Sequence, residues 1–140
     1  MTSAGYEYFD VAADVGVHAW GATTAAAFAQ AALGVLALTI APEEVQAGET
    51  REVRAQGDSV ESLLVHWINE CLYVHEIEGF AVRRVEVTTL TENVVHGLLH
   101  GEPIDPGRHR LGTVVKAATY HQVQVLAGEK GSEMRLIVDV

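Results

Sequence analysis

The chain has 140 residues, of which 49% are hydrophobic and 20% charged, a balance typical of a globular domain that can bury a hydrophobic core. Its 9 basic and 19 acidic residues give a net charge of −10. This charge argues against direct binding of RNA or DNA through a broad surface, and favours a cation or a protein partner with a basic face. The most apolar stretch, residues 25–40, is too short and too alanine-rich to span a bilayer, so we expect no membrane association.

Cysteine usage and the start of the chain bear on the cellular compartment. Cys71 is the single cysteine, which excludes an internal disulfide and fits a reducing environment. No basic segment followed by an apolar run opens the sequence, so we expect a cytoplasmic protein. No repeat or linker divides the sequence, and residues 1–140 are expected to form a single domain.

The first half of the chain is predicted to contain two strands, a helix and a third strand, at residues 6–10, 15–20, 24–38 and 51–55. A bend at Ala12–Asp14 separates the first two strands. Thr23 or Thr24 can cap the helix, whose apolar residues recur three and four positions apart. Pro42 ends this helix.

A second helix is predicted to begin at a capping box, in which Asp58 is the cap and Glu61 reaches back from three positions later. A wide apolar stripe follows, and Gly79 ends the helix. Four further strands are expected at residues 80–87, 93–101, 114–126 and 134–138. The sequence therefore predicts an α+β fold, with two amphipathic helices packed on one face of mostly antiparallel or mixed β-sheets of six to seven strands.

Patterns for catalysis are weak. His96 and His100 lie four residues apart, but no cysteine pair or HExxH pattern accompanies them, so strand histidines are favoured over a zinc site. Cys71 falls in the apolar stripe of the second helix, where a thiol is usually a small hydrophobic group. The segment 102–107 is predicted to be a turn whose carboxylates are exposed to solvent.

Carboxylates at the two ends of the chain are a further candidate site. Asp10 and Asp14 lie near the start, and Asp139 is followed by Val140 with its free α-carboxylate. If the final strand runs beside the first, these groups converge as hard oxygen ligands for calcium, magnesium or manganese. Exposed strand-end acids are the alternative reading.

Four stretches also carry a resemblance to a known family. The sequence resembles the archease family over nearly its whole length, through "YEYFDVAADVGVHAWG", "GDSVESLLVHWINECLY", "GEPIDPGRHRLGTVVKAATYH" and the terminal "LIVDV". The resemblance implies a small α+β protein that is an accessory factor rather than an enzyme. Its implied partner is the GTP-dependent RNA ligase RtcB, whose guanylylation and turnover archeases promote in tRNA splicing and RNA repair.

The resemblance also implies site residues. The family carries a divalent metal, calcium in some members, and the matching ligands here are Asp14, Asp139 and Val140; magnesium, manganese and zinc are alternatives. Lys116 matches a functionally important lysine, and His121 belongs to the same stretch. With Asp10 these residues are our candidates for partner contact and activation. The family usually has His-Thr-Ala-Asp in its first motif, whereas this chain has Val11-Ala12-Ala13-Asp14, so two polar groups beside the metal aspartate are missing.

Two other functions remain open at this stage. A small metal-dependent phosphoester hydrolase would need a general base, for which the sequence offers His18, His109 and His121 without a fixed relation among them. A scaffold that binds another partner, with solubilising acids, is the third reading. The oligomeric state is not indicated by any pattern.

Overall fold

The computed structural model describes residues 3–140, which form seven strands, two α-helices and one short 3₁₀ turn. Their bounds are β1 Gly5–Val11, β2 Asp14–Gly21, α1 Thr24–Ala37, the 3₁₀ turn Pro42–Glu44, β3 Glu49–Gln56, α2 Val60–Ile77, β4 Phe80–Leu90, β5 Val94–Pro103, β6 Ala117–Gly128 and β7 Gly131–Asp139. No helix in this described range is long and apolar enough to cross a membrane.

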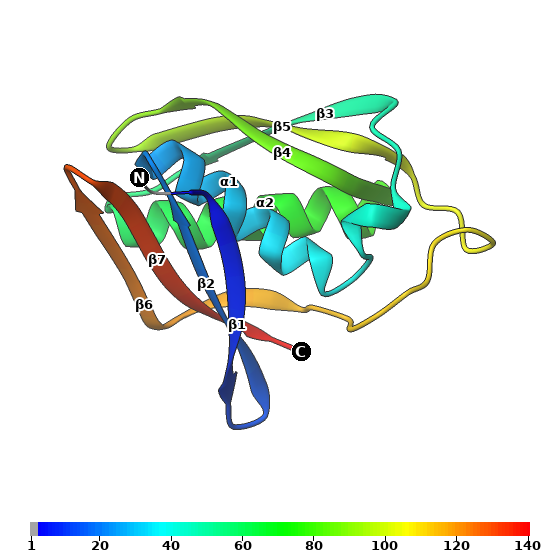
Figure 1. The fold of residues 1–140 in the computed structure, drawn as a ribbon, viewed down its shortest axis with the longest axis horizontal. Coiled ribbons are helices and arrows are strands. Elements are labelled where there is room, and N and C mark those ends of the chain that lie inside the picture. The colour runs from blue at the N-terminus through cyan, green and yellow to red at the C-terminus, as the bar shows by residue number, and fades with distance from the viewer. Residues whose placement is uncertain (1–2) are drawn as a thin grey trace.

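The strands form two separate antiparallel sheets, with the helices between them (Figure 1). One sheet has the order β1-β2-β7-β6 and the other β3-β5-β4. The α+β class and the seven antiparallel strands confirm the prediction from sequence. The prediction that both helices cover one sheet face was wrong, because each helix packs against strands of both sheets. A helix between two layers needs apolar residues on more than one side, and the alanine-rich α1 supplies them.

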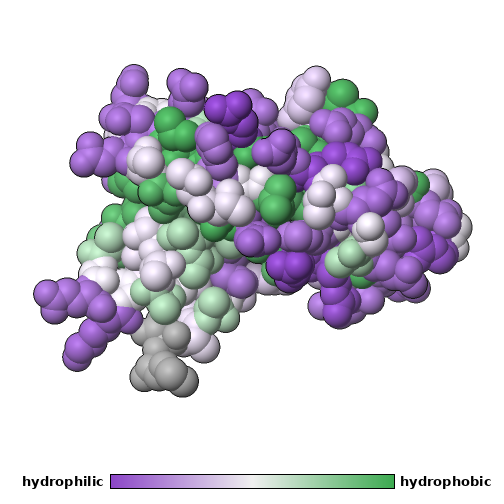
Figure 2. Space-filling view, turned by 90° about the horizontal axis from the view of Figure 1, so that it is seen from above, coloured by the Kyte–Doolittle hydropathy of each residue, from purple (hydrophilic) through white to green (hydrophobic). Residues whose placement is uncertain are grey.

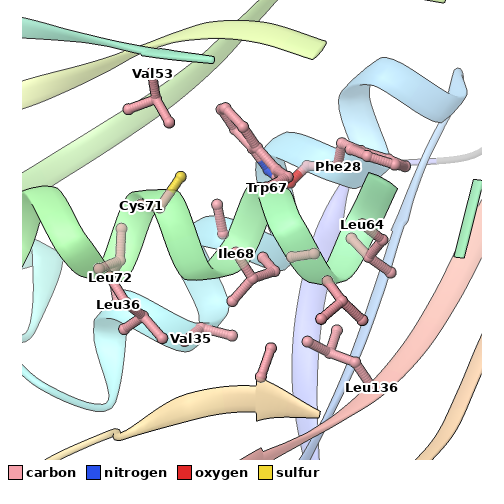
Figure 3. Close-up of a cluster of buried hydrophobic side chains, with 14 of the residues drawn as sticks. Phe28, Val35, Leu36, Val53, Leu64, Trp67, Ile68, Cys71, Leu72 and Leu136 are labelled. Atoms are coloured by element: carbon pink, nitrogen blue, oxygen red, sulfur yellow. The ribbon is translucent and has the colours of Figure 1, made fainter. Parts of the chain in front are cut away.

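The core fills the space on both sides of the helices (Figure 3). Trp67 of α2 is fully buried and donates its indole N–H to the carbonyl of Phe28 on α1, at 3.0 Å, so this hydrogen bond joins the two helices and pairs the buried indole N–H. Val53 lies on the side of the three-stranded sheet, and Leu136 on the side of the four-stranded sheet. Cys71 is buried in this core, which raises the pKa of its thiol well above the ordinary value, so its expected role as a hydrophobic group is confirmed.

The helix starts follow capping rules, although one cap was misassigned. Thr23 caps α1, and its side chain accepts the backbone N–H of Ala26 at 3.0 Å, as expected. At α2 the prediction of Asp58 with Glu61 was wrong. Ser59 is the cap and exchanges hydrogen bonds with Ser62, so the box is displaced by one residue. Both patterns satisfy the same spacing, and the serine pair fits the extended backbone at residue 59.

The outward face of the three-stranded sheet is mostly polar. Figure 2 shows the molecule from above, with hydrophilic side chains covering much of the surface away from the N-terminus. On this face His96 accepts a hydrogen bond from Arg54 at 3.2 Å, and His100 lies 3.0 Å from a carboxylate oxygen of Glu86. The two histidines share a face, as their spacing predicts, but each has its own partner, in line with the interpretation as strand histidines.

One predicted strand is shorter than expected. Residues 114–116 have no regular structure, and β6 begins at Ala117. The connection from β5 to β6, residues 104–116, is here called the strap. It leaves β5 at the right of the view in Figure 1 and passes below the helices to the start of β6.

Candidate functional site

The chain-end carboxylates are brought together by strand register. β2 pairs with β7 so that Val15 lies opposite Val138. The same antiparallel register, carried one residue further, sets Asp14 beside Asp139. Residues directly opposite each other in an antiparallel pair point to the same face of the sheet. Successive side chains of a strand point to opposite faces, and Val138, the neighbour of Asp139, is buried in the core. The side chains of Asp14 and Asp139 therefore point to the outer face. We call Asp14, Asp139 and the adjoining Val140 the acidic rung.

The acidic rung fits a hard divalent cation by its donor chemistry. In residues 3–140, no hydrogen bond or ion pair uses the side-chain oxygens of Asp14 or Asp139. Val140 follows Asp139 directly and is 36% exposed. Like charges opposite one another destabilise a sheet unless a counter-ion lies between them. An all-oxygen set open to water is the kind that calcium prefers.

Lys116 lies against the acidic rung. Its backbone N–H donates to the carbonyl oxygen of Asp139 at 2.8 Å, so the end of the strap is fixed to the end of β7. Its side chain is exposed and takes part in no ion pair formed by the described part of the chain. Lys116 thus adds an exposed basic residue whose backbone is hydrogen-bonded to Asp139.

His121 and Asp10 lie away from the acidic rung. The pairing of β6 with β7 shifts between Thr119 and Gln124, and His121 stands exposed in this irregularity beside Gln122, whose φ is 55°. Asp10 lies opposite Val15 and therefore on the other face of the sheet from Asp14. The structure joins Lys116 to the rung but not these two residues.

Position 11 faces the acidic rung directly. Val11 lies opposite Asp14 across the β1-β2 hairpin, so its side chain shares the outer face. Ala12 and Ala13 form the turn, and Ala13 has φ 65°. The imidazole that the resembled motif usually has at position 11 would therefore stand beside Asp14, and Val11 supplies no polar group there.

The histidines proposed as bases for a hydrolase do not converge on the acidic rung. His18 lies on the outer face two strand positions beyond Gly16, with Nδ1 2.9 Å from Glu7 and Nε2 3.9 Å from Glu133. His109 is 2% exposed and belongs to the strap. Its Nδ1 accepts the backbone N–H of Asp105 at 2.9 Å, which makes it a neutral imidazole that donates from Nε2.

Glu102 is a residue whose importance the sequence did not reveal. The prediction that its carboxylate is exposed was wrong, because its side chain is only 13% exposed and binds His109 at 2.9 Å, Arg108 at 2.6 Å and the backbone N–H of Gln46 at 2.9 Å. The hydrogen bond from Arg108, then those from Gln46 and His109, lower its pKa to about 2. This network holds the strap in place, and no local pattern predicts it, since the partners come from two segments, the strap and the residues before β3.

Comparisons with known proteins agree on one family. Residues 6–140 match the model of the Archease protein family (MTH1598/TM1083). A protein archease of Ictalurus punctatus is 36% identical, with 96% of this chain and 85% of that protein aligned. A protein archease of Pyrobaculum islandicum is 34% identical over 96% of this chain and 95% of that protein.

A solved structure shows the same fold. The solution structure of Methanobacterium thermoautotrophicum protein 1598 superposes with a TM-score of 0.78 at 30% identity, covering 97% of this chain and 99% of that one. Sequence and fold agree over nearly the whole chain. The protein therefore belongs to the archease family, whose members are non-catalytic protein cofactors.

Proposed function

We propose that this protein activates an RtcB-type GTP-dependent RNA ligase, promoting guanylylation of the ligase and its turnover in tRNA splicing and RNA repair. The observation that supports the proposal is the β2-β7 register, which pairs Val15 with Val138 and so directs the unpaired carboxylates of Asp14 and Asp139 to one strand end, next to Val140. Membership of a protein-cofactor family supports a protein partner, and a net charge of −10 suits a basic face on that partner.

In this proposal Asp14, Asp139 and the α-carboxylate of Val140 hold one divalent ion, calcium first, with magnesium, manganese or zinc as alternatives. When bound, the ion supplies positive charge at a surface that is otherwise acidic. Lys116, whose backbone is bonded to Asp139, adds an ammonium group that can pair with a phosphate or a carboxylate of the ligase. His121 and Asp10 are assigned to outer contacts with the ligase, away from the ion.

The chemistry of nucleotidyl transfer explains why such a surface is useful. Attack of a histidine on the α-phosphate of GTP requires the nucleophile in its neutral form and the phosphates in line. An accessory protein that docks over the nucleotide site can order these groups and exclude water without reacting itself. The reacting atoms then belong wholly to the ligase and GTP.

The test is single-turnover guanylylation of the cognate ligase with GTP and divalent metal, with and without this protein. We expect acceleration by the wild-type protein and its loss in Asp14→Ala and in Asp139→Ala. Glu92→Ala is the matched control, an exposed acid in the β4-β5 turn that forms no hydrogen bond or ion pair within residues 3–140. Acceleration unaffected by either rung variant would contradict the proposed mechanism.

A further inference from the structure

A groove lies between the C-terminal half of α2 and the strap. Its volume is about 280 Å³, and its lining is mainly apolar. The side chains that matter here are Leu72 and Glu76 from α2, and Ile104, Leu111, Val114 and Val115 from the strap. This groove is separate from the acidic rung.

The rim of the groove exposes large apolar side chains. Leu111 is 63% exposed and Val114 is 73% exposed, while Tyr73 and Ile77 of α2 are 56% and 63% exposed. Leu111 and Val114 line the groove, whereas Tyr73 and Ile77 are exposed on the same half of α2 without lining it. Clustered apolar exposure around a groove marks an interaction site rather than scattered surface residues.

The strap presents these residues on a fixed backbone. Gly112 and Thr113 donate their N–H groups to the carbonyls of Thr39 and Leu38, at 2.7 and 2.8 Å. A Cβ at Gly112 would stand 2.6 Å from the carbonyl oxygen of Leu38, so only glycine allows this approach. Since Leu111 and Val114 flank this anchored pair, binding to them costs little ordering of the strap.

The charge beside the groove indicates what kind of partner fits. Glu76 lines the groove and is exposed. It takes part in no ion pair formed within the described residues, and the whole chain is strongly acidic. A segment with apolar side chains flanked by Lys or Arg would fill the groove and neutralise this carboxylate.

The strap connects the groove to the acidic rung along the chain. Lys116, two residues after Val114, is bonded to Asp139. A partner seated on Leu111 and Val114 is therefore held beside the rung.

We propose that the groove is the docking site for an apolar segment of the RNA ligase flanked by basic residues, which anchors the ligase while the acidic rung acts on its nucleotide site. This inference rests on the proposed function. In this inference the two surfaces have different roles: the groove provides affinity for the ligase, and the acidic rung accelerates its guanylylation. A substitution in one should leave the role of the other intact.

The experiment measures both properties with Leu111→Asp, Val114→Asp and the control Leu126→Asp, a 50% exposed leucine on β6 outside the groove. The dissociation constant for the ligase is measured by calorimetry, and guanylylation is measured at saturating protein. Each groove variant is expected to weaken binding by about tenfold or more while reaching wild-type acceleration at saturation. Asp139→Ala should show the reverse, near wild-type binding with lost acceleration.

Several results would overturn the docking assignment. One is wild-type affinity in both groove variants, with folding verified by circular dichroism. Another is a wild-type dimer in sedimentation that Leu111→Asp converts to monomer, since the groove would then bind a second copy. A wild-type protein that binds the ligase through the groove without accelerating it would refute the proposed function alone. A wild-type protein that does not bind the ligase would refute both.

Discussion

Glu102 is the carboxylate whose ionisation the fold changes most clearly. Hydrogen bonds from Arg108, Gln46 and His109 lower its pKa to about 2 from an ordinary value of 4.5. The native state therefore releases this proton more readily than the unfolded state does. Its stabilising contribution is present above pH 4.5 and is lost as the pH falls toward 2.

We expect Glu102→Gln to flatten this acid dependence, because the amide does not titrate. The free energy of unfolding, measured by urea denaturation at several pH values between 5 and 2, should fall less steeply in the variant than in the wild type. Glu92→Gln is the control, since Glu92 takes part in no ion pair within residues 3–140. Equal slopes in Glu102→Gln and wild type would show that the network does not hold the strap.

Gly97 sets the space available to the central tryptophan. A Cβ at this position would lie 2.5 Å from the ring of Trp67 and 2.7 Å from the carbonyl oxygen of Glu86. We expect Gly97→Ala to lower the free energy of unfolding by about 1–3 kcal/mol, since the backbone oxygen cannot move aside easily. Tryptophan fluorescence during urea denaturation measures this change in the free energy of unfolding.

Gly48→Ala is the matched control for this prediction. No heavy atom outside its chain neighbours lies within 4 Å of the added Cβ, so the change should be small or slightly stabilising. Equal destabilisation in the two variants would point to backbone entropy rather than to packing against Trp67.

At the scale of single elements, the start of α2 distinguishes two capping arrangements that the sequence allows. The structure assigns the cap to Ser59, whose side chain accepts the N–H of Ser62 at 3.1 Å. Ser59→Ala should cost about 1 kcal/mol, and Asp58→Ala should cost only a few tenths. Thermal unfolding of the two variants measures the difference, and a larger loss in Asp58→Ala would reverse the assignment.

Elements were easier to predict from sequence than the layers they build. The apolar spacing placed both helices, and alternation placed most strands, because burial on one side imposes the period of the element. The same spacing does not say that α1 is covered on two sides, although its many alanines allow it. The sequence predicts a strand from Val114, three residues too early, because Val114 and Val115 extend the apolar pattern of β6, whereas of these two only Val115 is buried.

At the scale of the whole molecule, the candidate site depends on which strands are neighbours. Spacing alone could suggest Asp14 and Asp139, but their approach requires β7 to lie beside β2, which pairs residues more than a hundred positions apart. Local patterns do not encode such pairing, and the family resemblance supplied it. Asp10 shows the same limit, since the hairpin turn places it on the face opposite Asp14.

The most direct test of the account is calcium binding by the isolated protein. Titration calorimetry of the metal-free wild-type chain should show one calcium ion per chain, and Asp14→Ala or Asp139→Ala should abolish it because each removes a charged ligand. Asp10→Ala is the control, as this acid lies on the other face of the sheet and should leave the affinity unchanged. No calcium binding by the wild type, or equal binding in the rung variants, would contradict the central claim that the acidic rung holds the ion.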